Sequence, residues 1–327
     1  MAKPTIYVTR KLPKEIISEL TKNYQVKMWE EEEQPVPKDV LAEEIKQADA
    51  ILSMLTDTID DNLLNMAENL KVIANLAVGF DNIDIEACER RGITVTNTPD
   101  VLTDTTADLV FGLLLATARR IPESVDYIKD DRWKTWSPYM MAGSDVHHKT
   151  IGIVGMGSIG EAVAKRATGF EMEILYHNRS RKPEAEKNLG ATYVSFEELL
   201  ERSDFVVTMV PLTPETKGIF NRDAFQKMKE NAFFINASRG AVVVEDDLVE
   251  AIEKGEIQGA GLDVFENEPI HSDHQVLQFD QVVALPHIGS ASMETRNQMI
   301  ELAAKNIDRV LKGEEPITPV TTIANKN

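Results

Sequence analysis

The sequence predicts an α/β protein with two domains, each built on a doubly wound parallel sheet. Three observations lead to this prediction. Short β-rich segments alternate with amphipathic ones, which is the order of strand–helix units in a parallel sheet. The alternation occurs in two series, the second of which begins near residue 150. The length of 327 residues is sufficient for two hydrophobic cores.

The first series contains five expected strands, separated by helical stretches. Helices are expected at residues 13–23 and 37–48, where apolar residues recur at helical spacing. One long helix is expected over residues 104–131 for the same reason. The strands, rich in apolar and β-branched residues, are expected at residues 5–10, 25–29, 50–54, 71–79 and 93–97.

The second series contains six expected strands and a final helix. The amphipathic stretch 292–313 is interpreted as a helix that packs back on the first domain. We therefore expect a discontinuous first domain, residues 1–99 plus 290–327, and a second domain over residues 100–289. The strands are expected at residues 150–155, 173–177, 204–210, 232–238, 259–264 and 281–287.

Composition and charge exclude several classes of partner. The net charge of −19 argues against nucleic acid and against an anionic membrane surface. The longest apolar run, Leu109 to Ala118, is shorter than the roughly 18 residues that a membrane span needs. The first ten residues show no apolar core of a secretory signal. With Cys88 as the single cysteine, the expected location is the reducing cytoplasm.

A glycine-rich turn, "VGMGSIG", joins the expected strand at 150–155 to a helix. Gly155 permits the tight turn, Gly157 lets the backbone approach a pyrophosphate, and Gly160 lets the helix lie close to the sheet. The amides of Ser158 and Ile159 would then point at the phosphates from the positive end of the helix. Strand, turn and helix together predict a dinucleotide site, although a glycine turn without a ligand is the alternative.

The segment "HNRSRK" follows the expected strand 173–177, where an acidic residue usually binds the ribose hydroxyls of NAD. Asn178 carries no charge that would repel a 2′-phosphate, while Arg179, Ser180 and also Arg181 offer donors for one. We therefore predict that NADP(H) is preferred and that NAD(H) is possible. The alternative is a solvated basic loop without a ligand.

Three charged side chains follow strands of the second series, where ligand sites gather in open α/β sheets. Arg239 in "NASRGAVV" could bind a carboxylate with its planar fork. His287 in "LPHIGS" could protonate a developing alkoxide. Glu268 in "LDVFENEP" could orient the imidazole from its other nitrogen. These roles suit the reduction of a 2-keto acid, but each residue taken singly also has an ordinary structural interpretation.

The motifs "VGMGSIG", "INASRGAVV", "GLDVFENEP", "LPHIGSAS", "NLAVGFDNID" and "NTPDVLTDTTAD" together resemble the D-isomer-specific 2-hydroxyacid dehydrogenase family over nearly the whole chain. The sequence is most similar to the glyoxylate/hydroxypyruvate reductase branch. The resemblance implies a Rossmann-type cofactor domain and a flavodoxin-like substrate domain. It also implies reduction of glyoxylate to glycolate and of hydroxypyruvate to D-glycerate.

The same resemblance implies residue roles. Arg239 would bind the substrate carboxylate, His287 would donate the proton and Glu268 would be its partner. The segment "DRWKTWSPYMM" resembles one that reaches across a homodimer, which would place Trp136 in the partner's substrate pocket. Backbone amides for the substrate carboxylate would come from Leu76, Ala77, Val78 and Gly79. The remaining cofactor contacts, besides the turn and the basic segment, would be Thr106, Val210, Pro211, Ala237, Ser238, Arg239, Asp263, His287 and Gly289.

Four other functions remain as alternatives. A formate-type enzyme would carry Gln in place of Glu268, and an NAD-dependent phosphoglycerate dehydrogenase would not need Arg179. A dinucleotide-sensing binding protein on the same fold could keep all the catalytic residues. His271 and His274 near Glu266 and Glu268 could bind a metal, but their spacing matches no familiar site, so no metal is predicted.

Overall fold

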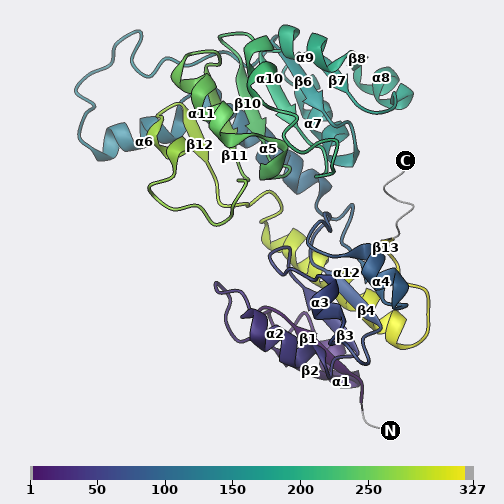
Figure 1. The fold of residues 1–327 in the computed structure, drawn as a ribbon. Helices are drawn as coiled ribbons and strands as arrows, with labels where there is room; N and C mark the ends of the chain where they lie inside the picture. Colours follow the sequence, from purple (N-terminus) through teal and green to yellow (C-terminus); the bar gives the residue numbers. More distant parts are fainter. Residues whose placement is uncertain (1–2, 321–327) are drawn as a thin grey trace. The chain divides into compact units, whose positions relative to one another are not determined.

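In the computed structural model, which describes residues 3–320, the chain forms two compact units. Unit 1 comprises Met1–Leu102 and Ser292–Asn327, and unit 2 comprises Thr103–Ala291. Residues 1–2 and 321–327, at the ends of the expected first domain, lie outside the described residues. Each unit is an α/β unit built on its own sheet (Figure 1).

Unit 1 contains a six-stranded sheet in the order β13-β5-β4-β3-β1-β2. The five strands from the first part of the chain are parallel, and only β13 is antiparallel to its neighbour β5. The chain direction across the sheet reverses between β1 and β3, as in flavodoxin-like sheets. The strands are β1 (Thr5–Val8), β2 (Gln25–Met28), β3 (Ala50–Ser53), β4 (Val72–Asn75), β5 (Thr94–Thr96) and β13 (Pro319–Val320).

Five helices within the described residues belong to unit 1, and the last of them comes from the far end of the chain. This helix, α12, packs on β3, β4 and β5. Short polar side chains begin several of these helices by accepting hydrogen bonds from backbone amides, such as Asp84 from Ala87 and Ser292 from Thr295. The helices are α1 (Ser18–Asn23), α2 (Lys38–Ile45), α3 (Asp61–Leu64), α4 (Ile85–Arg90) and α12 (Met293–Leu311).

Unit 2 contains a seven-stranded parallel sheet in the order β12-β11-β10-β9-β6-β7-β8. Its direction reverses between β6 and β9, which is the Rossmann arrangement. Its helices are α5 (Thr103–Ala118), α6 (Ile121–Lys129), α7 (Ser158–Thr168), α8 (Pro183–Leu189), α9 (Phe196–Arg202), α10 (Arg222–Lys227) and α11 (Glu245–Glu253). Its strands are β6 (Thr150–Val154), β7 (Glu173–His177), β8 (Thr192–Tyr193), β9 (Phe205–Thr208), β10 (Phe233–Asn236), β11 (Gly259–Leu262) and β12 (Val282–Ala284).

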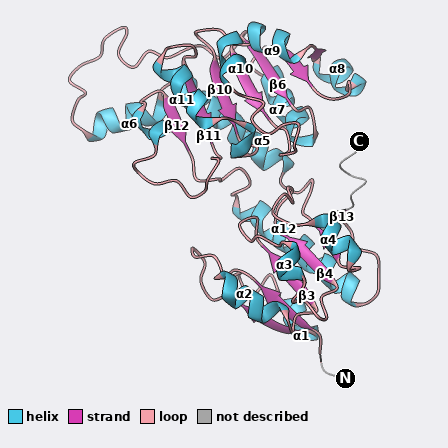
Figure 2. Cartoon of the chain, viewed as in Figure 1, coloured by secondary structure: helices cyan, strands magenta, loops and turns pink. Residues whose placement is uncertain are grey.

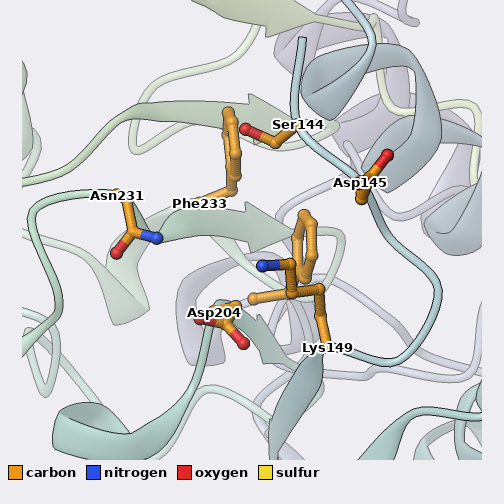
Figure 3. Close-up of a pocket in the computed structure, with 7 residues that line it drawn as sticks. Ser144, Asp145, Lys149, Asp204, Asn231 and Phe233 are labelled. Atoms are coloured by element: carbon orange, nitrogen blue, oxygen red, sulfur yellow. The ribbon is translucent and has the colours of Figure 1, made fainter.

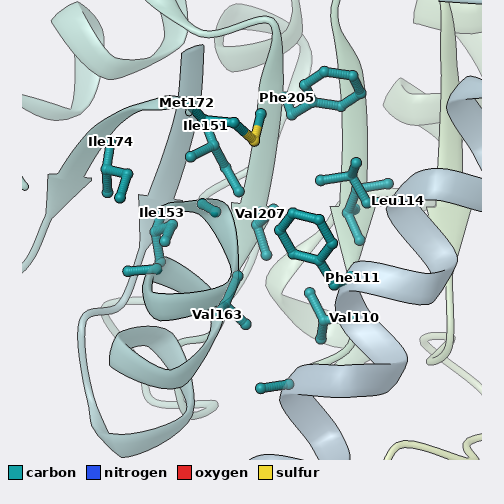
Figure 4. Close-up of a cluster of buried hydrophobic side chains, with 14 of the residues drawn as sticks. Val110, Phe111, Leu114, Ile151, Ile153, Val163, Met172, Ile174, Phe205 and Val207 are labelled. Carbon is teal, nitrogen blue, oxygen red and sulfur yellow. The ribbon is translucent and has the colours of Figure 1, made fainter. Parts of the chain in front are cut away.

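Two hydrophobic clusters cover the two faces of the unit 2 sheet. Phe205 and Val207 of β9 enter the cluster beneath α5 and α7, together with Phe111 and Val163 of those helices (Figure 4). Val206, between them in sequence, enters the opposite cluster beneath α9, α10 and α11. Because successive strand side chains alternate between faces, this sheet is buried on both sides, as parallel sheets with apolar strands usually are.

The single long helix expected over residues 104–131 is two helices in the structure. α5 ends at Ala118, Arg120 adopts a left-handed conformation with φ of 54°, and α6 begins at Ile121. Pro122 has no N–H to continue the ladder, so it can stand only in the first turn of a helix. The carbonyl of Ala118 instead accepts the amide of Ser144 at 2.9 Å. A long loop then leads from α6 to β6 (Figure 2).

The strand expected over residues 71–79 is also shorter than predicted. β4 ends at Asn75, and the next residues leave the sheet after the amide of Leu76 bonds the carbonyl of Ser53 at 2.8 Å. The apolar residues of "LAVG" continue the pattern of a buried strand, so composition alone does not indicate that β4 ends at Asn75. The segment is a loop at the carboxyl edge of the unit 1 sheet.

Candidate active site

The glycine turn follows β6 at the point where the strand order of unit 2 reverses. Gly155 has φ of 103°, a region that favours glycine. A Cβ on Gly160 would lie 2.2 Å from the carbonyl oxygen of Gly155, so only glycine allows α7 this close approach. A Cβ on Gly157 would have no atom within 4 Å, so the space beside the turn is open. Open space beside the amino end of α7, at Ser158 and Ile159, fits a dinucleotide pyrophosphate.

The basic segment follows β7 and forms a small turn. The side-chain amide of Asn178 donates to the carbonyl of Ser180 at 3.3 Å, and Tyr193 Oη donates to the carbonyl of Asn178 at 3.2 Å. Arg179 and Ser180 are exposed. Arg181 instead forms a two-bond pair with Glu186, at 3.0 and 2.7 Å, which uses its planar fork. Arg181 is therefore engaged with Glu186 of α8, while Arg179 and Ser180 stay predicted phosphate donors.

Arg239 follows β10 in a turn that Asn236 organises. The side-chain oxygen of Asn236 accepts both the amide and the hydroxyl of Ser238, at 3.0 and 2.9 Å. Its side-chain nitrogen donates to the carbonyl of Arg239 at 3.0 Å. The half-buried Arg239 bonds the carbonyl of Ser238 through Nη1 at 2.8 Å. Sequence reasoning did not single out Asn236, although an asparagine at a strand end before a turn is a usable signal.

Three of the expected cofactor residues lie together beside the end of β11. Asp263 is buried, and its two carboxylate oxygens accept the amides of Ile288 and Gly289, each at 2.8 Å. A Cβ on Gly289 would lie 3.3 Å from Asp263 and 3.4 Å from Thr106 of α5. Burial raises the pKa of Asp263, while these amides and His287 oppose the rise. Asp263 thus fixes the backbone immediately after His287.

His287 and Glu268 form a directly bonded pair. His287 Nδ1 lies 2.8 Å from Glu268 Oε2, and Glu268 Oε1 accepts the amide of Phe265 at 3.0 Å. The side chains of His287 and Glu268 are 26% and 28% exposed, so water can reach both. His287 has φ of 54°, and its amide bonds the carbonyl of Leu285 at 3.1 Å. The sharp turn after β12 therefore directs the ring back toward Glu268.

The electrostatics of the pair determine which atom carries the proton between them. Burial alone would raise the pKa of Glu268, but the bond and charge of His287, the Phe265 amide and Arg239 together lower it below its ordinary value. Glu268 is therefore a carboxylate at neutral pH and can only accept. His287 Nδ1 must donate, which leaves Nε2 as the ring nitrogen that can exchange a proton with a ligand.

The loop Leu76–Gly79, expected to supply backbone amides, follows β4 of unit 1. Leu76 and Ala77 are buried, whereas Val78 and Gly79 are half-buried. The carbonyls of Ala77, Val78 and Gly79 all accept hydrogen bonds from this unit, from the Thr98 amide and from the side chains of Asn97 and Asn75. Asn75 and Asn97 are two further residues that sequence reasoning did not single out.

The other expected residues lie at the carboxyl edge of the unit 2 sheet or on its long loop. Val210 and Pro211 follow β9, and Ala237 precedes Ser238 after β10. Trp136 lies in the loop after α6 with 73% of its surface exposed. Trp133, in the same loop, is 55% exposed and so is not a core residue.

The alternative of a metal site at His271 and His274 has no support among residues 3–320. No group of three or more His, Cys, Asp or Glu side chains in this described part is placed to hold an ion. His274 instead faces Glu245, with Nε2 3.5 Å from Oε2, and its ring meets Phe265 edge to face. In the same described part, no helix is long and apolar enough to cross a membrane.

A pocket of about 130 Å³ lies at the opposite edge of the unit 2 sheet, where strands begin (Figure 3). Lys149 precedes β6, Asp204 precedes β9, and Phe233 starts β10. The Lys229 ammonium bonds Asp204 at 2.9 Å beside it. Because ligands of open α/β sheets bind at the carboxyl ends of strands, this pocket is separate from the candidate site.

Known proteins resemble the chain over almost its whole length. Residues 111–289 match the family model described as D-isomer specific 2-hydroxyacid dehydrogenase, NAD binding domain. The glyoxylate reductase of Thermococcus litoralis is 49% identical over 318 residues, which are 96% of this chain and 96% of that protein.

Two solved structures extend the likeness to the fold. A protein from Thermus thermophilus is 42% identical with a TM-score of 0.91, over 97% of this chain and 100% of that one. An NADPH-dependent glyoxylate/hydroxypyruvate reductase from Sinorhizobium meliloti was solved with NADP and malonate. It is 33% identical with a TM-score of 0.86, over 98% of this chain and 97% of that one. The chain therefore belongs to the D-isomer specific 2-hydroxyacid dehydrogenases, which makes it an NAD(P)-dependent dehydrogenase.

Proposed function

We propose that the protein is an NADP(H)-preferring reductase of small 2-keto acids, converting glyoxylate to glycolate and hydroxypyruvate to D-glycerate. The observation that carries the proposal is the His287–Glu268 pair, because its 2.8 Å bond leaves Nε2 of the ring available to protonate a carbonyl oxygen. The names of the relatives, glyoxylate reductase and glyoxylate/hydroxypyruvate reductase, support the substrate class.

In this mechanism each residue performs a separate task. Arg239 binds the substrate carboxylate with its planar guanidinium, and the amides of the Leu76–Gly79 loop bind the same group. His287 donates the proton that the developing alkoxide needs, while Glu268 keeps the ring oriented and stabilises its charge. The nicotinamide of the bound cofactor supplies the hydride. Thr106, Val210, Pro211, Ala237, Ser238, Asp263 and Gly289 contact the nicotinamide side in this proposal.

The preference for NADP(H) rests on the turn after β7. Asn178 has no charge to repel a 2′-phosphate, and Arg179 and Ser180 are exposed donors beside it. The Sinorhizobium meliloti relative, NADPH-dependent by its title, supports the same choice. NAD(H) remains the second cofactor of the proposal, because the glycine turn fits either dinucleotide.

The proposed working form is a homodimer held by α6 and the loop that follows. None of the nine residues of α6, all of them described, is buried, and Ile121, Val125 and Ile128 expose one apolar face at helical spacing. Trp136 and Tyr139 continue the exposed apolar surface. A second copy covering this face would place Trp136 near the partner's substrate, and light scattering on the purified protein would measure the assembly.

We further propose that residues 100–289 form the cofactor domain, that residues 1–99 plus 290–327 form the substrate domain, and that the protein works in the cytoplasm. The decisive experiment measures initial rates with glyoxylate, hydroxypyruvate, 3-phosphohydroxypyruvate and pyruvate, each with NADPH and with NADH. The proposal expects turnover of the first two acids with NADPH. Faster turnover of the phosphorylated acid with NADH would identify a phosphoglycerate dehydrogenase. Cofactor binding without turnover of any acid would identify a sensing protein.

A further inference from the structure

The loop after β4 has an unusual distribution of hydrogen bonds. Three consecutive carbonyl oxygens accept hydrogen bonds from unit 1: that of Ala77 from the Thr98 amide at 2.8 Å, that of Val78 from Asn97 Nδ2 at 2.8 Å, and that of Gly79 from Asn75 Nδ2 at 2.9 Å. Among the residues that the structure describes, none accepts a hydrogen bond from the amides of Val78, Gly79 or Phe80.

Peptide geometry connects these two facts. A trans peptide is planar, and its C=O and N–H point in opposite directions. Fixing the carbonyl of Val78 toward Asn97 therefore directs the amide of Gly79 away from Asn97. The peptides on either side are also held at their carbonyls, so each of the three amides points away from the group that holds its own carbonyl. Successive amides that face the same way form a concave site for an anion, which is the role that the proposed function gives to this loop.

We propose that Asn97 is a positioning residue, whose side-chain amide sets the orientation of the Val78–Gly79 peptide and so keeps the carboxylate-binding amides of the loop in place. This inference rests on the proposed function, in which the loop binds the substrate carboxylate. It adds a residue to which the resemblance assigns no role. Asn97 touches neither substrate nor cofactor in this proposal; it acts only through the peptide.

The position of Asn97 separates this role from a general structural one. Its backbone is held independently, because its amide bonds the carbonyl of Thr318 at 3.3 Å and its carbonyl accepts the Thr318 hydroxyl at 2.7 Å. Its side chain is half-buried and has one hydrogen bond, to the Val78 carbonyl. Removing the side chain therefore releases the peptide and leaves the attachment of β5 to β13 intact.

Asn75 holds the next peptide from inside the unit. It is fully buried, accepts the Ser53 hydroxyl at 3.1 Å, and donates to Asn82 at 3.2 Å as well as to Gly79. Asn82 in turn donates to the carbonyls of Met54 and Asp57, at 3.2 and 2.9 Å. This network ties the loop to the end of β3, and its burial makes Asn75 a poor site for a clean test. Asn97 is the better one.

The test compares three variants in the full-length protein. Asn97→Ala removes the donor without adding charge. Asn97→Asp keeps the shape of the side chain but presents a carboxylate, which cannot donate to the Val78 carbonyl when ionised. Thr318→Val is the matched control, because it removes a hydroxyl bonded to Asn97 and Asn306 at the same sheet edge and leaves the Asn97 side chain in place.

Steady-state kinetics with glyoxylate and NADPH, together with inhibition by oxamate, give the readout. We expect Asn97→Ala to raise the KM for glyoxylate and the inhibition constant of oxamate by roughly 10- to 100-fold, the range of one hydrogen bond to a charged group. The KM for NADPH should stay within about twofold and kcat should fall much less than KM rises, since carboxylate binding is uniform binding. Asn97→Asp should raise the KM for glyoxylate and the oxamate constant more than Asn97→Ala does. Thr318→Val should lower Tm and leave the KM for glyoxylate and the oxamate constant within about threefold of the wild-type values.

The possible results distinguish the positioning role from a structural one and from a failure of the proposed function. If both Asn97 variants fold and keep the wild-type KM for glyoxylate and the wild-type oxamate constant, the positioning role is wrong. It is also wrong if Thr318→Val raises these constants as much as Asn97→Ala does, because the effect would then be structural. Should Asn97→Ala not fold, Asn97→Asp, of equal shape, decides the matter alone. A wild-type protein that turns over no 2-keto acid overturns the proposed function instead, before any variant is compared.

Discussion

The carboxyl edges of the two sheets carry polar groups of different kinds. In unit 2, the groups of the proposed site are side chains: Arg239 after β10, Glu268 after β11 and His287 after β12. In unit 1, the side chains at the corresponding edge bond to one another and to the backbone, and the groups proposed to bind a ligand are the peptide amides after β4. Side chains at equivalent edges of two sheets can thus either belong to the proposed site or hold the backbone in place.

Two carboxylates show the difference most clearly. Burial raises the pKa of Asp57 in unit 1, although the Thr9 hydroxyl, the Met54 amide and Arg10 oppose the rise. The pKa of Glu268 in unit 2 is lowered, because His287, the Phe265 amide and Arg239 outweigh its burial. A sheet edge therefore does not determine the role of a carboxylate; the groups around it do.

The largest effect is expected from the proposed proton donor. His287→Ala should lower kcat by roughly 10²–10⁴, the usual contribution of general acid catalysis, with NADPH affinity nearly unchanged. Steady-state rates and cofactor titration measure the two quantities. A variant with near wild-type kcat would mean that unit 2 does not act through this side chain.

Arg239→Lys tests whether the geometry of the charge matters as well as its sign. An ammonium keeps the charge but cannot supply two parallel hydrogen bonds, so kcat/KM for glyoxylate should fall by roughly 10- to 1,000-fold. Rates over a range of glyoxylate concentrations measure it. Full activity of Arg239→Lys would show that the carboxylate is bound elsewhere, with the amides of unit 1 as the remaining candidate.

The turn after β7 should affect cofactor choice alone. Asn178→Asp combined with Arg179→Ala should invert a preference for NADPH of roughly 10- to 1,000-fold, since each bond to the 2′-phosphate contributes about 1.5–3 kcal/mol. The change should appear in the KM for the cofactor, because the phosphate is remote from the hydride. Measuring kcat/KM with both cofactors decides it, and a wild-type preference for NADH would make the segment a solvated loop.

The smallest effect, and the most direct contrast between the two units, lies in the pH dependence of stability. The folded-state pKa of Glu268 lies below the unfolded value of about 4.3, so its stabilisation is complete above that pH and is lost as pH falls through the folded pKa. The folded-state pKa of Asp57 lies above about 3.9, so its contribution is largest below that pH and is lost as pH rises through the folded pKa.

Glu268→Gln and Asp57→Asn should therefore change relative stability in opposite directions between pH 3 and pH 7. As pH rises, the wild type should gain stability relative to Glu268→Gln and lose it relative to Asp57→Asn. Each change should be on the order of 1 kcal/mol, or about 2–4 °C in Tm. Thermal unfolding of the three proteins across this range measures it, and trends of the same sign would contradict the contrast.

Much of the fold could be predicted because its periodicities are strong. β7 coincides with the expected strand at 173–177, and every other expected strand contains a real one. The break after α5 was missed because the apolar spacing continues through Arg119 and Arg120, although Pro122 was a visible signal. β13 has two residues and depends wholly on its neighbour β5, so no local pattern marks it.

Some features of the candidate site could likewise be predicted from the sequence, and others could not. The sequence can predict that His287 and Glu268 belong together, because their chemistry is in their side chains. It cannot predict that Arg181 is engaged by Glu186, since that depends on where α8 begins. Nor can it predict which way the peptide after Val78 faces, because that orientation is fixed by Asn97, nineteen positions along the chain.

The discontinuity of unit 1 also has a consequence for the order in which the chain folds. Unit 2 is one continuous segment, whereas unit 1 needs α12 across its strands and β13 at its edge. Tyr24 bonds Asp308 across 284 positions, at 2.9 Å, and Asn97 meets Thr318 only after all of unit 2 has been synthesised. Because domains fold as their residues emerge from the ribosome, we expect unit 2 to be complete first. Until α12 has been made, the apolar face of β3 and β4 lacks its covering helix, so residues that follow unit 2 in the chain close the unit whose strands precede it.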